Sequence, residues 1–159
     1  MDLFTIAIAF DGKISHFEKD MVKSAYGDLY AVYQPRLVLL INNLKKGKLH
    51  AAADSVAWAM QSTRYQALQK GYTYELTISA ANNTYQVLSK PIGASSFSNV
   101  GGAVPLTASP VTVSATTTLT FSPNGSVTVV AGAQTITLTY SGFTETVTVT
   151  NYGSVTVTP

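Results

Sequence analysis

The sequence contains no cysteine, and only 11% of its 159 residues are charged. The absence of cysteine excludes disulfide scaffolds, cysteine-based zinc sites and cysteine nucleophiles. With 46% hydrophobic and 10% aromatic residues, the composition also excludes an intrinsically disordered chain. The length suits one domain of ordinary size.

Charge almost disappears in the second half of the chain. Of the 18 charged residues, 17 lie at or before Lys90, and the 69 residues that follow carry Glu145 alone. The segment 29–90 holds seven basic residues against Asp54 and Glu75, so the basic excess belongs to the middle of the chain. This asymmetry predicts that the two halves are built differently.

No apolar run has the ~20 residues that span a bilayer. Residues 3–10 form an eight-residue run that lacks the basic start and cleavage site of a signal peptide, and we expect a short strand or the edge of a helix there. The most hydrophobic run, 37–41, is bounded too closely by Arg36 and by Asn42 and Asn43 to form a span.

Helical periodicity dominates residues 16–70. It predicts one amphipathic helix over about 16–33, a second short helix that starts at Pro35, and a break at 45–48. A third helix is predicted from about Leu49 to Lys70, with Gly71 as its C-terminal stop. Its apolar stripe contains Leu49, Ala53, Val56, Met60 and Ala67.

From residue 72 onward the period changes to two. Segments 72–79 and 84–88 predict a hairpin, and 89–110 predict a long loop that has room for a short strand. Six further strands are predicted within 111–158, where apolar residues alternate with threonines. The expected fold is α+β: N-terminal helices, with helix 49–70 laid across one antiparallel sheet built from 72–158.

Two groups of motifs carry a family resemblance. The first is the helix over 49–71, with its alanines, Arg64 and closing Gly71; the second is the Phe121-Ser-Pro123-Asn-Gly125 turn, the strand 134–138 and the final hairpin around Gly153. Over about residues 35–159 the chain resembles the globular part of the FimT/GspH-like minor pilins and type II secretion pseudopilins. Residues 1–34 do not match the long apolar helix of that family, so we expect a division into an atypical segment 1–34 and a pilin-like domain 35–159.

The resemblance implies a non-enzymatic subunit that helps to assemble a type IV pilus or a type II secretion pseudopilus. Its implied partners are other pilin or pseudopilin subunits, and the inner membrane before assembly. Its implied location is the bacterial cell envelope or an extracellular filament. Some FimT-like proteins bind DNA through arginines after the last glycine; Ser154, Val155 and Thr156 stand here instead, which argues against that route. An alternative is a secreted or surface binding module that engages glycan or protein through its threonine face or the 89–110 loop.

The apolar run 37–44 is the candidate subunit interface. In a pilin-like subunit it would lead from the filament core into the head, so its members would contact neighbouring subunits: Leu37, Leu40, Ile41 and Leu44. The alternative is that they pack within the chain against residues 3–32, and the sequence does not choose between the two.

The basic cluster offers a second candidate. Lys45, Lys46 and Lys48, with Arg36, Arg64 and Lys70 along the chain, could meet DNA phosphates or anionic lipid head groups. A solvated helix junction is the simpler reading, because no aromatic residue interleaves with the lysines. A third candidate is a sugar-stacking surface of Tyr72, Tyr74 and Tyr85, for which half-buried sheet positions are the simpler reading.

Catalysis would need a cluster that the sequence does not supply. His16 and His50 are predicted at helix starts and lie 34 residues apart, which is not a metal-ligand spacing. Asp54 and Ser55 lack a nucleophile-elbow motif, and a helix-start role suits Asp54 better. We therefore expect no catalytic, metal or cofactor site.

Overall fold

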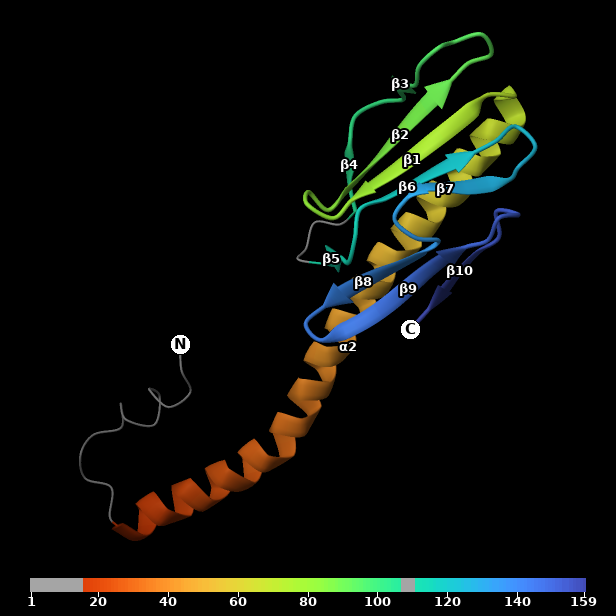
Figure 1. Cartoon of the computed structure of the whole chain (residues 1–159). Coiled ribbons are helices and arrows are strands. Elements are labelled where there is room, and N and C mark those ends of the chain that lie inside the picture. The colour runs from red at the N-terminus through yellow and green to blue at the C-terminus, as the bar shows by residue number, and fades with distance from the viewer. Residues whose placement is uncertain (1–15, 107–110) are drawn as a thin grey trace. The chain divides into compact units, whose positions relative to one another are not determined.

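The computed structural model describes residues 16–106 and 111–159 (Figure 1). Contacts divide the chain into two units, residues 1–42 and 43–159, and every strand in the described part of the chain lies in the second unit. The elements are α2 (His16–Lys70), β1 (Thr73–Ser79), β2 (Thr84–Lys90), β3 (Ser98–Asn99), β4 (Val104–Pro105), β5 (Thr112–Val113), β6 (Thr117–Phe121), β7 (Val127–Ala131), β8 (Thr135–Tyr140), β9 (Phe143–Val149) and β10 (Val155–Thr158).

One helix runs from His16 to Lys70 where the sequence predicted three. The predicted break at 45–48 is wrong because Gly47 costs only about 1 kcal/mol relative to alanine and lysines are good helix formers. Pro35 lies inside the helix, although it removes one backbone hydrogen bond. A helix that is already formed gains a bond with each added residue, so these costs do not end it. The predicted element at 3–10 lies outside the described residues.

The strands form two antiparallel sheets, and the prediction of a single sheet is wrong. The first sheet has the order β3-β2-β1-β6-β7, with β4 also paired to β2, and the second has the order β10-β9-β8-β5. The predicted hairpin is confirmed as β1–β2, and β3 and β4 lie within the predicted 89–110 loop. The division follows β7, where Gly132 adopts φ +81° and an added Cβ would collide with Thr117. Beyond that turn, β8 pairs with β9 and β5 rather than with β7.

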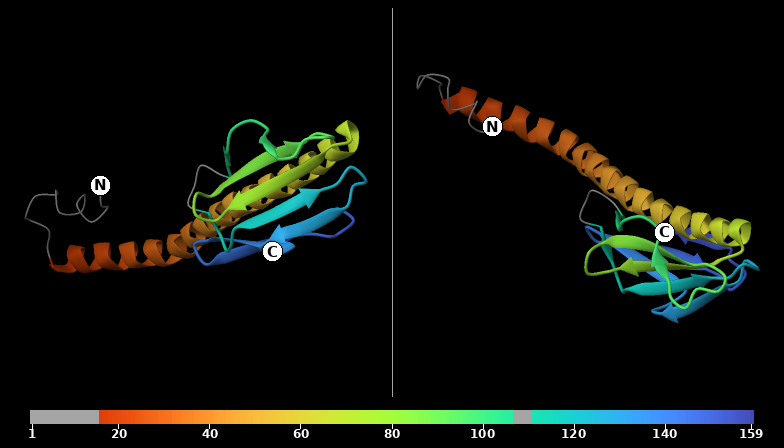
Figure 2. Two further views of the ribbon diagram at one scale, coloured as in Figure 1. Left: turned by 45° about the horizontal axis from the view of Figure 1, so that its top comes forward. Right: turned by 90° about the horizontal axis from the view of Figure 1, so that it is seen from above.

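Buried residues of α2 and of both sheets form one hydrophobic core. Figure 2 shows the helix lying along the strands, in agreement with the expected α+β class. From the helix, the predicted stripe of Leu49, Ala53, Val56, Met60 and Ala67 is almost fully buried. The sheets add their inward-facing residues: Leu76, Ile78, Leu119, Phe121, Ile136, Leu138, Val147 and Val149. The intervening threonines point away from the core and pair across strands, as in the 3.1 Å hydrogen bond between the Thr135 and Thr148 hydroxyls.

Arg64 connects α2 to a turn of each sheet. Its Nε donates a hydrogen bond of 3.1 Å to the carbonyl oxygen of Gly125, in the β6–β7 turn. A Cβ on Gly153, in the β9–β10 turn, would overlap the Arg64 side chain. The Val127 amide donates a 2.8 Å hydrogen bond to the Asn151 carbonyl and so links the two turns directly. The arginine and both glycines are thus parts of one junction.

We expect Gly153→Ala to destabilise the protein more than Gly142→Ala. Both glycines have positive φ, +77° and +85°, but only Gly153 faces Arg64, whereas nothing lies within 4 Å of a Cβ on Gly142. Left-handed backbone costs alanine about 1–2 kcal/mol at either position, and overpacking adds about 1–3 kcal/mol at Gly153. Thermal or urea unfolding of both variants measures the difference. When Arg64 is also replaced by alanine, Gly153→Ala should cost less additional stability than it does in the wild type, because the overlap with Arg64 is gone. Equal losses of stability in Gly153→Ala and Gly142→Ala would contradict the junction.

Candidate functional site

Six large aliphatic side chains lie exposed on α2 between residues 37 and 44. Their exposed fractions run from 42% to 62%, and they are Leu37, Val38, Leu39, Leu40, Ile41 and Leu44. Five of them are consecutive, so at about 100° per residue they surround the helix instead of forming one stripe. The alternative that they pack against residues 3–32 involves side chains outside the described part of the chain.

This apolar segment is a strong candidate for an interaction surface. Burying one such side chain is worth about 1.5–3 kcal/mol, and contiguous exposed apolar patches mark sites of association. Among the described residues, no helix is long and apolar enough to cross a membrane. The four positions that the sequence singled out, Leu37, Leu40, Ile41 and Leu44, all belong to the segment.

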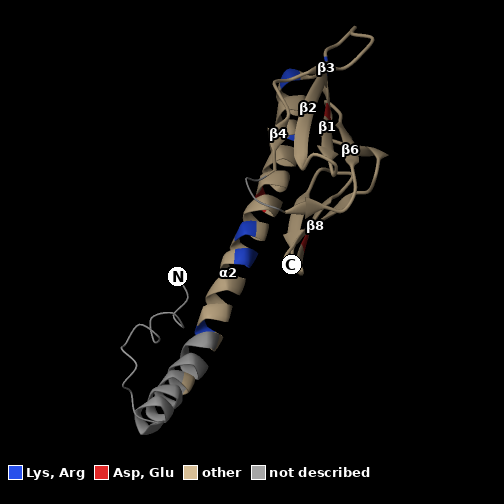
Figure 3. Ribbon diagram, turned by 90° about the vertical axis from the view of Figure 1, so that its left-hand side faces the viewer, with Lys and Arg blue, Asp and Glu red and all other residues tan. Residues whose placement is uncertain are grey.

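The lysines follow the apolar segment on the same helix, and Figure 3 shows them in blue in the middle of α2. The Nζ of Lys46 lies 5.3 Å from the centroid of the Phe143 ring at the start of β9, so an aromatic residue does meet this cluster. From Lys48, Arg64 and Lys70 are about 24 and 33 Å further along the helix at 1.5 Å per residue. The wider basic cluster that the sequence predicted is therefore not one surface.

His50 is held between two carboxylates. Its Nδ1 lies 3.1 Å from Glu145 Oε2 on β9, and its Nε2 lies 3.6 Å from Asp54 Oδ2 one helical turn away. The hydrogen bond to Glu145, followed by the negative charges of Asp54 and Glu145, raises the pKa of His50 above its ordinary 6.5. The prediction that His50 and Asp54 start a helix is wrong, because α2 is continuous through both.

The three residues form an electrostatic clasp between α2 and β9. Glu145 is buried at 9% exposure, so its carboxylate needs a cationic or hydrogen-bonding partner, and His50 provides one. In the described residues no group of three or more His, Cys, Asp or Glu side chains is arranged to hold a metal. The sequence contained one indication of this clasp, since Glu145 is the lone charge after Lys90.

We expect Glu145→Gln to lower the pKa of His50 toward 6.5, and Asp54→Asn to lower it less. Because the folded pKa is raised, the clasp stabilises the fold fully below the ordinary pKa and loses that contribution as the pH rises through the folded value. An NMR titration of the imidazole checks the pKa order. A His50 pKa that both variants leave unchanged would contradict the clasp.

The tyrosines do not form a sugar-stacking surface. Tyr74 and Tyr85 are buried at 1% and 9% exposure, and Tyr72 packs against the core. The prediction of sheet positions is confirmed for Tyr74 and Tyr85, although both are buried instead of half-buried, whereas Tyr72 is half-buried and precedes β1.

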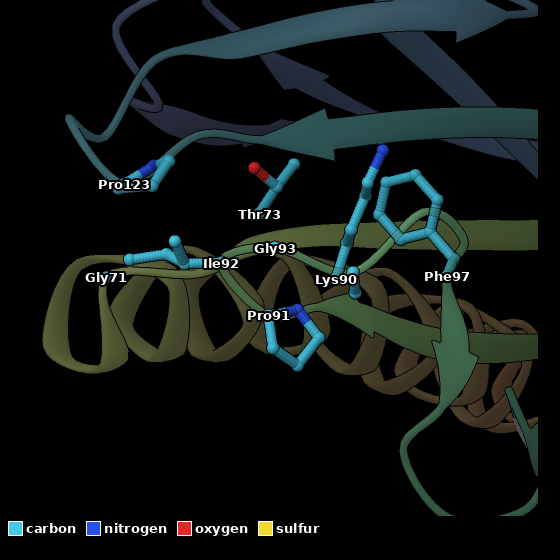
Figure 4. Close-up of a pocket in the computed structure, with 9 residues that line it drawn as sticks. Gly71, Thr73, Lys90, Pro91, Ile92, Gly93, Phe97 and Pro123 are labelled. Atoms are coloured by element: carbon cyan, nitrogen blue, oxygen red, sulfur yellow. The ribbon is translucent and has the colours of Figure 1, made fainter.

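A hollow of about 340 Å³ lies beside the C-terminal end of α2 (Figure 4). Thr73, Ile92 and Pro123 line it, together with Lys90, whose Nζ stands 5.9 Å from the ring centroid of Phe97. A smaller groove of about 170 Å³ lies between α2 and the β2 side of the first sheet, beside the exposed ring of Trp58. Sequence reasoning found neither, because each is assembled from distant segments.

Comparison with known proteins matches residues 52–153 to the family model described as type II transport protein GspH. Two solved structures share the fold. The minor pseudopilin EpsH of the type 2 secretion system of Vibrio cholerae aligns with a TM-score of 0.53 and 12% identity, over 70% of this chain and 96% of EpsH. The type IV minor pilin FimU of Pseudomonas aeruginosa aligns with a TM-score of 0.54 and 18% identity, over 72% of this chain and 90% of FimU. No curated protein sequence matches the chain.

Proposed function

Because the chain belongs to the GspH family of type II transport proteins, we propose that it is a non-enzymatic minor pilin or pseudopilin subunit, which helps to assemble a type IV pilus or a type II secretion pseudopilus. The observation that carries the proposal is the exposed aliphatic segment 37–44 on α2. A helix with six solvent-facing aliphatic residues gains most by packing against other helices. Its neighbours in the filament would be other pilin-type subunits.

The strand-rich part of the chain, which we call the head, is suited to such a subunit because it carries little charge after Lys90. The described residues after Lys90 present threonine-rich strands in which Glu145 is the one charged side chain, and that residue is nearly buried. Such a face adds little charge repulsion between adjacent heads. The cell envelope or an extracellular filament is the corresponding location.

Lys45, Lys46 and Lys48 have a proposed secondary role in this arrangement. They follow the apolar segment directly, where anionic lipid head groups would attract them before assembly. Binding to DNA through these lysines is the weaker alternative, because they form a short band on one helix and lack stacking aromatics other than Phe143.

The first test is whether the chain is recovered by mass spectrometry from sheared surface filaments or from membranes of its host. Recovery in either fraction supports the proposal. Recovery only as a free, unassembled protein would overturn it and would favour a glycan- or protein-binding module.

We expect Leu40→Glu to reduce filament-associated protein by about tenfold or more, because a carboxylate in an apolar contact costs more than about 1.4 kcal/mol. Leu40 is 58% exposed, so the unfolding temperature should stay near that of the wild type. Gln69→Glu, at another exposed position of α2, adds the same charge outside the apolar segment and is the matched control. Quantitative immunoblots of sheared filaments give the comparison; equal incorporation of both variants would refute the interface.

A further inference from the structure

The groove beside Trp58 is a preformed apolar recess. Trp58, Ser62 and Gln66 of α2 form one wall, and Val87, Val100 and Val104 contribute to the other. Trp58 is the single tryptophan of the chain and is 64% exposed, while Val100 and Val104 are 38% and 42% exposed. Apolar atoms therefore face solvent on both sides of the groove.

Hydrogen bonds hold the outer wall in place. The Val100 amide donates to the Val87 carbonyl oxygen over 2.8 Å, and the Gln86 side chain donates to the Gly101 carbonyl oxygen over 3.1 Å. Further along, the Leu106 amide donates to the Asn83 carbonyl oxygen over 2.9 Å. A partner would thus meet a wall that is already ordered, with little conformational entropy left to lose.

The composition and size of the groove restrict what can fill it. None of its nine lining residues carries a charge, which disfavours nucleic acid, free anions and acidic peptides. Its volume of about 170 Å³ is smaller than the ~300–1,000 Å³ of small-molecule sites. A protruding aliphatic side chain suits both limits.

The geometry points to this groove as the receptor for an aliphatic helix segment of a neighbouring pilin-type subunit, an inference that rests on the proposed function. The chain itself shows the kind of segment required, since residues 37–44 expose six aliphatic side chains on a helix. A contact between a segment of one subunit and a groove at a different place on its neighbour is heterologous. Each subunit added through such a contact still exposes one of the two surfaces, so assembly continues as an open filament when the subunits do not close into a ring. Trp58 supplies the aromatic anchor that is enriched at interface centres.

Site-specific photo-crosslinking in the filament-producing host tests the inference. A photo-reactive amino acid replaces Ser62, which lines the groove, or Gln61, the neighbouring exposed residue that does not. We expect Ser62 to crosslink to an aliphatic helical peptide of a pilin-type subunit, identified by mass spectrometry, about tenfold more than Gln61. Adding Trp58→Ala should lower the Ser62 product about tenfold through loss of the anchor, with the unfolding temperature unchanged.

Three results would overturn the receptor groove while the chain is still recovered in filaments: equal products from the two positions, a Ser62 product that maps to strand or loop peptides or to a glycan, or a product that Trp58→Ala leaves unchanged. The proposed function would survive each of them. Absence of the chain from filaments, in contrast, would overturn the proposed function and this inference together.

Discussion

The arrangement of the head depends on the contact between one arginine and two glycines. Arg64 reaches from α2 to the Gly125 carbonyl oxygen in the first sheet and lies where any side chain at Gly153 would stand in the second. The two sheets share no backbone ladder, so contacts other than strand pairing set their relative positions. These contacts are the hydrogen bond from Val127 to Asn151 and packing in a core shared with α2. The helix contributes twice, through its alanine-rich buried face and through Arg64. Small residues on that face let both sheets approach closely, and the charged tip reaches the turns beyond them.

The sequence predicted the elements of the head better than their connections. Alternation of threonine with aliphatic residues marked β8 and β9, because burial on one face imposes a period of two. It could not show that β7 and β8 belong to different sheets, because the turn between them includes Gly132, which has positive φ and approaches Thr117 of the neighbouring strand β6 too closely for a side chain. The resemblance drew on Arg64, Gly125 and Gly153 as separate motifs, and only the folded chain brings them into one junction.

The helix was mispredicted for a different reason. Pro35 and Gly47 are local breakers, and a local reading assigns each a boundary. In the structure, α2 passes through both. The apolar stripe from Leu49 to Ala67 is buried against the sheets, whereas residues 37–41 are exposed. Periodicity also could not show which apolar residues of the helix are buried within the chain and which are exposed, since apolar residues occur in both segments. The exposed fractions of the side chains in the structure show that the apolar residues in 37–44 face solvent, and this supports the segment as the candidate site.

Three charged side chains of the head are engaged within the fold. Glu145 is buried against His50, Arg64 is bonded to a backbone carbonyl, and Lys46 stands over Phe143. Two further surfaces that another molecule could contact are apolar: the aliphatic segment on α2 and the uncharged groove at Trp58. Surfaces of this kind associate through area removed from water, and salt screens them little. Assembly through them would accordingly persist at ionic strengths that dissociate a phosphate-binding patch of lysines, which separates the pilin-type role from the nucleic-acid alternative on physical grounds.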